Sequence, residues 1–178
     1  FKNVYFTGMV RDSQRRKMSK SLGNSPDALE LIEQYGADAV RFGMLSSSPA
    51  GGDLLYEEKL IELGRNFCNK MWNSLRLIKG FEISESKETP IVSSLAVNWI
   101  NDKFNHTLNK VNDDYHKYRI SSVLNTLHSF VKDDFSSWFL EMIKPEYGEA
   151  IDIWSYNRAI EMYEKVVIML HPFMPFIT

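Results

Sequence analysis

Four long stretches of the chain carry an apolar residue at every third or fourth position, which is the spacing of a helix that buries one face. The stretches cover residues 57–79, 97–115, 120–142 and 156–170. Gly80 follows the first, and Lys144-Pro145 and His171-Pro172 end the last two, because proline disfavours helical geometry in the residue before it. This pattern predicts a mainly α protein built on a four-helix bundle with short connections.

Two details refine the predicted bundle. Gly64 lies on the apolar stripe of the first helix, where glycine costs about 1 kcal/mol relative to alanine. We therefore expect another backbone to approach closely at that point. Residues 81–91 are rich in Glu, Ser and Lys and contain Pro90, so they predict a polar connector and a subdomain boundary.

The first 56 residues alternate short apolar runs with turns. Val4-Tyr5-Phe6 is β-branched and aromatic, which predicts a buried strand. Ser25-Pro26 supplies an N-cap and a first helical residue for a short helix that ends at Gly36. Residues 37–46 predict a second helix, and residues 53–56 a brief strand. The strand at residues 4–6 has no evident partner, so we expect the chain to be the carboxy-terminal part of a longer protein.

Residues 11–24 have no apolar periodicity and are dense in Ser, Arg, Lys, Gly and Asn, which predicts an exposed and mobile loop. The net charge of the chain is -2, but residues 1–25 carry six Lys or Arg against one Asp. The positive field therefore belongs to this opening segment. We divide the chain into residues 1–25, 26–56 and 57–178.

Composition excludes several classes of protein. The chain is 44% apolar and 13% aromatic, enough to bury a substantial core. Its single cysteine, Cys68, rules out an internal disulfide and a cysteine-based metal site, and we expect a buried, inert thiol. No apolar run approaches the roughly 20 residues that span a bilayer. We expect a cytoplasmic location, no membrane contact and no protein-bound metal.

The strongest chemical signal is the run from Lys17 to Asn24. Two ammonium groups, Lys17 and Lys20, can stabilise the negative charge that moves onto a departing polyphosphate. Ser19 and Ser21 can add hydroxyl donors, and Gly23 lets the backbone approach closely. Taken alone, such a basic run is more often a solvated loop, so its context has to decide.

That context resembles a known family. Lys17-Met18-Ser19-Lys20-Ser21, followed by Leu22-Gly23-Asn24, resembles the second signature of the class I aminoacyl-tRNA synthetases. Within the family, the sequence resembles the valine-specific branch more than the isoleucine- or leucine-specific branches, above all at Gly64 to Asn73. Further segments that fit the family are Tyr35 to Arg41, Asp53 to Leu55, Trp138 to Pro145 and His171 to Thr178.

The resemblance implies a helical anticodon-binding bundle, preceded by a small α/β connecting subdomain and the truncated end of a Rossmann-like catalytic domain. It implies that Lys20 and Lys17 act on the ATP phosphates, that Ser19 and Ser21 complete the loop, and that Met18 lies near the adenosine. The whole enzyme would join valine to ATP, with Mg2+ bound to the nucleotide, and transfer it to tRNA(Val). We expect a monomer.

Two features limit what the segment can do. The family's other ATP-binding signature, of the His-Ile-Gly-His type, does not occur in these residues, so we expect no activity from the segment alone. Two positions also depart from the family pattern. Thr7 stands where many relatives have histidine, and Arg15 replaces the usual glycine before Arg16-Lys17.

A weaker signal lies on the first long helix. Six polar residues beside its apolar stripe could contact tRNA, although a solvated helix face is the commoner explanation: Arg65, Asn66, Asn69, Lys70, Asn73 and Arg76. Trp72 and Trp138 could stack on bases. Both occupy apolar stripes, so packing in the core is the preferred interpretation. Two alternatives stay open: an isoleucine-specific relative, and a non-catalytic tRNA-binding module.

Overall fold

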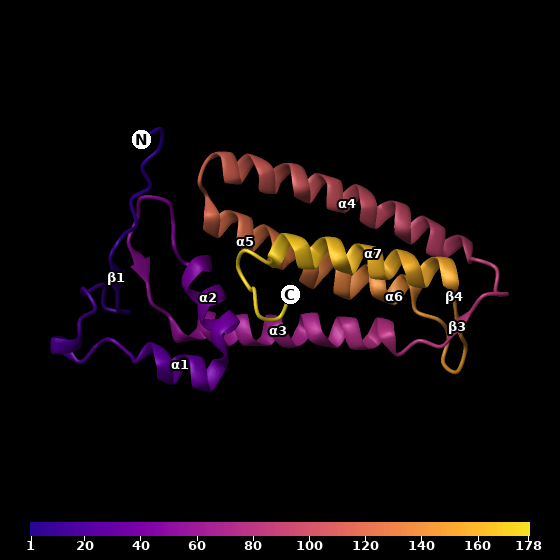
Figure 1. Ribbon diagram of the computed structural model, residues 1–178, viewed down its shortest axis with the longest axis horizontal. Coiled ribbons are helices and arrows are strands. Elements are labelled where there is room, and N and C mark those ends of the chain that lie inside the picture. Colours follow the sequence, from indigo (N-terminus) through magenta and orange to yellow (C-terminus); the bar gives the residue numbers. More distant parts are fainter.

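The computed structural model covers all 178 residues and is elongated, with most of its length in helices. Figure 1 shows α3, α4 and α7 running beside the helical segments α5 and α6, which confirms the helical bundle. The elements are β1 Val10–Arg11, η1 Lys20–Leu22, α1 Ala28–Tyr35, α2 Ala37–Ser46, β2 Leu54–Leu55, α3 Glu58–Lys79, β3 Ile83–Ser84, α4 Ile91–His116, α5 Ile120–Ser129, η2 Phe130–Phe139, α6 Leu140–Ile143, β4 Ile151–Asp152 and α7 Ile153–Leu170.

The predicted helix over residues 120–142 is continuous but changes its geometry in the middle. Between α5 and α6, η2 is a π-helix, in which each turn holds more residues than an α-helical turn. The Ser137 hydroxyl donates to the carbonyl oxygen of Lys132, five residues earlier, at 2.7 Å. A prediction that assumes 3.6 residues per turn therefore assigns some side chains of residues 130–139 to the wrong face of the helix.

A single core joins all the long helices to α2. Phe42 of α2 is fully buried, and its ring centroid lies 5.4 Å from Phe67 of α3 and 5.5 Å from His128 of α5. Burial lowers the pKa of His128, which favours the neutral imidazole between the two rings. The helix α2, which follows the lysine-rich loop and α1, is thus packed against the bundle through the aromatic cluster of Phe42, Phe67 and His128.

Glycine allows α2 and α3 to come close. A Cβ placed on Gly64 would lie 2.7 Å from the carbonyl oxygen of Ala39 and 2.9 Å from the Cβ of Phe42. These distances are too short for a side chain, so the expected close approach at Gly64 is confirmed. Beside it, Cys68 is half-buried, and burial raises the pKa of its thiol to about 11. The thiol stays protonated at neutral pH, as expected of an inert cysteine.

The carboxy-terminal segment folds back onto α2. The Asp38 carboxylate is buried and accepts hydrogen bonds from the backbone N–H groups of Phe176, at 3.1 Å, and Ile177, at 2.7 Å. One turn later, the guanidinium of Arg41 donates to the carbonyl oxygens of Pro172 and Phe173, each at 2.9 Å. The acidic and basic residues of the stretch Tyr35 to Arg41 therefore attach the carboxy-terminal segment to α2.

Both strand pairs are parallel and very short. β1 pairs with β2, with Val10 opposite Leu54, and β3 pairs with β4, with Ile83 opposite Ile151. The second pair closes the end of the bundle away from β1 (Figure 1). The predicted subdomain boundary at residues 81–91 is therefore wrong, because this connector pairs with the segment before α7 and the helices on both sides of it share one core.

Two predictions near the amino terminus also need correction. Residues 4–6 form no strand, and Val4 and Phe6 are 67% and 77% exposed, because β2 pairs only with residues 10–11. α1 is capped by Asp27, not Ser25: the Asp27 carboxylate accepts from the N–H of Leu29 at 2.7 Å. The brief strand predicted for residues 53–56 is confirmed as β2, and the helix predicted for residues 37–46 as α2.

None of the helices combines the length and the hydropathy needed to cross a bilayer.

Candidate functional site

The lysine loop, residues 12–24, follows β1 at one end of the molecule (Figure 1). Both Lys17 and Lys20 are exposed, and neither ammonium group forms an ion pair. Met18 and Ser19 are half-buried, and Ser21 is exposed. Because the two lysines are not neutralised by a protein carboxylate, they are available to an anion.

Two of the three arginines around the loop form ion pairs. Arg11 pairs with Asp53 beside β2, and the guanidinium of Arg16 pairs with Asp12 at 2.7 Å. The first pair joins β1, where the loop begins, to the residue before β2, and the second lies within the loop and closes its first turn. Arg11 and Arg16 are therefore used in ion pairs, whereas Lys17, Lys20 and the exposed Arg15 form none.

The loop, which the sequence predicts to be exposed and mobile, is exposed but holds internal hydrogen bonds and a short helix. The N–H of Met18 donates to the carbonyl oxygen of Val10 at 3.0 Å, and residues 20–22 form the 3-10 helix η1. The Ser19 hydroxyl caps η1 by accepting from the N–H of Leu22, and it lies 3.2 Å from the Ser21 hydroxyl. At its end, Gly23 has φ 65°, a conformation that glycine adopts without cost.

Asp12 is the centre of this order, and sequence reasoning missed it. Its carboxylate, only 9% exposed, accepts from the side-chain amide of Asn24 at 3.0 Å. It also accepts from the backbone N–H groups of Gln14, at 3.0 Å, and Arg16, at 2.9 Å, and from Arg16 Nε at 2.8 Å. The hydrogen bond from Asn24, aided by those from Arg16, lowers the pKa of Asp12 to about 2. An acidic residue at the edge of a basic run was the available signal.

Arg15, one of the two departures from the family pattern, has a backbone conformation that favours glycine. Its φ is 63°, in the left-handed region that favours glycine. A glycine at this position would adopt the conformation freely, whereas arginine is strained. The structure thus gives a backbone reason for the family's usual glycine, and it keeps the turn despite the substitution.

The six polar residues predicted on α3 separate into two groups. Four of them, Asn66, Asn69, Lys70 and Asn73, line a groove of about 350 Å³ between α3 and the η2–α6 segment. Ser136 and Leu140 form part of its other wall. Arg65 and Arg76 lie outside this groove and are exposed on the neighbouring stripe of α3.

Both tryptophans point to solvent, so their predicted packing in the core is wrong. Trp72 is 56% exposed and Trp138 is 62% exposed. Met71 takes the buried position next to Trp72. At Trp138, the wider turns of η2 bury Phe135 and Phe139 and rotate the indole outwards. By helical spacing, Trp72 falls on the same stripe as Arg65 and Arg76.

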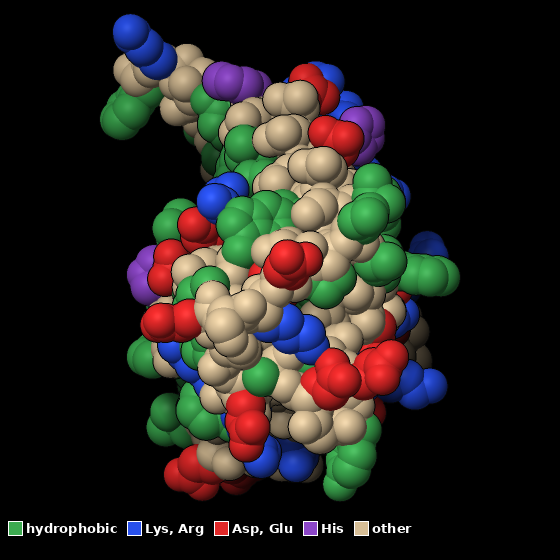
Figure 2. All heavy atoms as spheres, turned by 90° about the vertical axis from the view of Figure 1, so that its right-hand side faces the viewer, with side chains coloured by type: hydrophobic (Ala, Val, Ile, Leu, Met, Phe, Trp, Pro, Cys, Tyr) green, Lys and Arg blue, Asp and Glu red, His purple; other side chains and the backbone are tan.

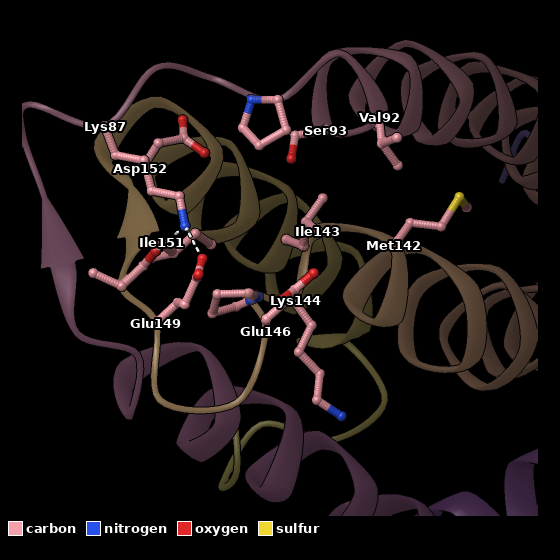
Figure 3. A pocket seen from close by; sticks show the side chains of 13 residues that line it. Lys87, Val92, Ser93, Met142, Ile143, Lys144, Glu146, Glu149, Ile151 and Asp152 are labelled. Carbon is pink, nitrogen blue, oxygen red and sulfur yellow. Dashed lines mark hydrogen bonds and ion pairs between the residues drawn. The ribbon is translucent and has the colours of Figure 1, made fainter.

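The distal end of the bundle holds another pocket, shown in Figure 3. There the Lys87 ammonium donates to the Glu149 carboxylate at 2.7 Å and to the carbonyl oxygen of Ala150 at 2.9 Å. Asp152 accepts from the Thr89 hydroxyl at 2.8 Å. These polar groups satisfy one another. The same end of the molecule shows acidic and basic side chains interspersed (Figure 2), which offers no field of one sign. No group of three His, Cys, Asp or Glu is placed to hold a metal ion.

Comparison with known families agrees with this geometry. Residues 1–57 match the family described as class I tRNA synthetases (I, L, M and V), and residues 97–178 match the anticodon-binding domain of tRNA ligases. Valine–tRNA ligases of Christiangramia forsetii and Porphyromonas gingivalis are 57% and 51% identical to the chain over all 178 residues. The chain spans 20% of the length of each of these relatives.

Two solved structures share the fold. A leucyl-tRNA synthetase of Agrobacterium radiobacter K84, in a ternary complex, aligns over 96% of the chain and 21% of its own length, with a TM-score of 0.68 and 23% identity. The methionyl-tRNA synthetase of Mycobacterium tuberculosis, with methionyl-adenylate, aligns over 96% of the chain and 35% of its own length, with a TM-score of 0.64 and 19% identity.

Proposed function

Since the chain belongs to the class I aminoacyl-tRNA synthetases, we propose that it supplies the phosphate-binding loop and the tRNA-binding bundle of a valine–tRNA ligase. The observation that carries this proposal is the pair of exposed, unpaired lysines, Lys17 and Lys20, on a loop that its own hydrogen bonds hold in shape. We assign residues 1–25 to the end of the catalytic domain, residues 26–56 to a connecting subdomain and residues 57–178 to the anticodon-binding domain.

In the proposed reaction, a carboxylate oxygen of valine attacks the α-phosphorus of ATP, and the bond to the oxygen that bridges the α- and β-phosphates breaks. Valyl-adenylate forms and pyrophosphate leaves. Negative charge increases on the departing oxygens, so ammonium groups that contact them stabilise the transition state more than bound ATP. Lys20 is the main contact, with Lys17 second. Met18, Ser19 and Ser21 shape the nucleotide side of the loop.

The partners of the proposed enzyme are ATP with its Mg2+, valine and tRNA(Val). The magnesium ion would arrive with the nucleotide, since its ligands would be phosphate oxygens and water. We propose a monomer in the cytoplasm, where free amino acids and tRNA meet. Identity to valine–tRNA ligases over the whole chain favours valine over isoleucine, and the lysine loop favours a ligase over a tRNA-binding module without catalysis.

The function is tested by amino-acid-dependent exchange of pyrophosphate into ATP. A full-length synthetase that carries this segment should support exchange with valine, and at least tenfold less with isoleucine at equal concentration. The 178-residue chain alone should support none. Preference for isoleucine would assign the segment to the other branch, and absence of exchange with every amino acid would contradict the proposal.

For the bundle, we propose that the exposed stripe of α3 contacts tRNA through Arg65, Trp72 and Arg76, with the adjoining groove of Asn66, Asn69, Lys70 and Asn73 available to base edges. Guanidinium groups pair with phosphate oxygens, and an exposed indole can stack on an unpaired base. The exposure of Trp72 supports this proposal, because a tryptophan this open to water gains by covering its ring.

Replacing Trp72 by alanine should weaken binding of tRNA(Val) to the full-length enzyme about 5- to 100-fold, the range for loss of one stacked base. Arg65→Ala should weaken it about 5- to 10-fold and reduce its dependence on salt by about one phosphate contact. Filter binding at several salt concentrations measures both effects. Arg158→Ala serves as the charge-matched control, since Arg158 is exposed on α7 and pairs with Glu161. Equal losses for Arg65→Ala and Arg158→Ala would contradict the assignment of the α3 stripe.

A further inference from the structure

A single side-chain hydrogen bond closes the lysine loop at its two ends. Asn24 Nδ2 donates to Asp12 Oδ2 at 3.0 Å, across twelve residues of sequence. The Asp12 carboxylate also holds the turn that follows it, through the N–H groups of Gln14 and Arg16. The pair thus fixes both the entry to the loop and its exit.

Asn24 also reaches into the loop at the residues beside Met18. Its side-chain oxygen accepts from the N–H of Ser19 at 2.9 Å, and its side-chain nitrogen donates to the carbonyl oxygen of Lys17 at 3.3 Å. The backbone on both sides of Met18 is therefore bound to one side chain. Lys17 is directly attached to this arrangement, and Lys20 follows in η1, which begins at the Ser19 cap.

The charges are arranged consistently with a role beyond folding. Asp12 is the only acidic residue of the loop, and its oxygens are occupied by Arg16 and Asn24. A carboxylate in this position that lacked those partners could pair with Lys17 or Lys20 and compete with a phosphate. With both oxygens occupied, the loop keeps a negative charge without neutralising either lysine.

We propose that Asp12 and Asn24 are positioning residues that hold the backbone of the lysine loop in the conformation that presents Lys17 and Lys20 to the polyphosphate of ATP. The inference rests on the proposed function of those lysines. In this role Asp12 and Asn24 act through the backbone of residues 16–19, to which both are hydrogen-bonded. Holding charged groups in place before the reaction removes the cost of ordering them in the transition state, and a misplacement of about 1 Å can cost 100-fold in rate.

The test uses the near-isosteric change Asn24→Asp in a full-length synthetase that carries this segment. The new carboxylate still accepts from Ser19, but it places an acceptor and a negative charge against Asp12. We expect kcat for valine-dependent pyrophosphate exchange to fall about 10- to 100-fold, while the KM for valine changes less than twofold. Adding Asp12→Asn restores a donor to the pair in the opposite direction, so the double variant should regain at least threefold over Asn24→Asp alone.

Asp113→Asn is the matched control, because Asp113 also pairs with a cation four residues later, Lys117, and lies on α4 outside the lysine loop. It should leave exchange unchanged. Thermal melting of the 178-residue chain shows whether each variant still folds. The positioning role is overturned, and the proposed function stands, if Lys20→Ala abolishes exchange while Asn24→Asp leaves kcat intact. The same holds if the effects of Asn24→Asp and Asp12→Asn are simply additive in the double variant. If Lys20→Ala has no effect on exchange, the proposed function itself fails.

Discussion

Replacing Lys20 by alanine should lower kcat for valine-dependent pyrophosphate exchange about 100- to 1,000-fold in a full-length synthetase that carries this segment. Removal of one group that stabilises developing charge in a transition state has effects of this size. The Lys20 side chain forms no ion pair and is exposed, so its loss leaves the internal hydrogen bonds of the loop in place. The effect should therefore arise from chemistry rather than from folding.

The kinetic constants separate an effect on valine binding from an effect on the chemical step. The KM for valine should change less than threefold, because Lys20 acts on the phosphates, and kcat should carry the loss. Lys2→Ala, another exposed lysine in the opening segment, is the control and should have no effect. A variant that loses valine binding but keeps its maximal rate would contradict the assignment of Lys20 to the departing pyrophosphate.

The second large effect is on stability. Phe42→Ala should lower the free energy of unfolding of the 178-residue chain by about 3–5 kcal/mol, the usual cost of removing a buried phenylalanine ring. Phe42 is fully buried and contacts both Phe67 and His128, so its loss opens a cavity where α2, α3 and α5 meet. Urea denaturation followed by circular dichroism measures the change.

Two controls distinguish this effect from a general sensitivity to losing aromatic rings. Phe42→Leu should cost less than half as much, because leucine fills part of the space. Phe6→Ala, at a ring that is 77% exposed, should stay within about 0.5 kcal/mol of the unchanged chain. A loss below 1 kcal/mol for Phe42→Ala would mean that the attachment of α2 to the bundle does not depend on this aromatic cluster.

The attachment connects two parts of the molecule that the proposed enzyme would use for different steps. The lysine loop leads through α1 into α2, and α2 is held to the bundle by Phe42 and to the carboxy-terminal segment by Asp38 and Arg41. Gly64 lets the two helices approach. The lysine loop and the helical bundle are therefore joined by packed structure.

Hydrophobic periodicity was sufficient to predict the long helices because each of them buries one continuous face. Gly64, lying on such a face, correctly indicated a close approach of backbones. The same period gave the wrong exposure for Trp138, since η2 has more residues per turn than an α-helix. The sequence has no proline or glycine there that would indicate the change. The period failed at Trp72 because that residue lies at the edge of the buried stripe, where sequence spacing alone does not decide exposure.

Short strands were predicted less well than helices. Residues 4–6 have the composition of a strand, but a strand needs a partner, and the partner available here reaches only residues 10–11. β3 and β4 have two residues each, and the paired residues Ile83 and Ile151 lie 68 positions apart in the sequence. No local sequence pattern could therefore predict their pairing. Composition describes a segment, whereas pairing is a property of the whole fold.

The sequence by itself determined the four long helices, the inert cysteine, the basic opening segment and, through the run from Lys17 to Asn24, the family. These features depend on local order along the chain. Only the tertiary structure decided that Asp12 and Asn24 close the lysine loop, that Asp38 and Arg41 hold the far end of the chain, and that Trp72 faces water. Each of these depends on groups that lie far apart in sequence or on the exact turn of a helix, and folding alone brings such groups together.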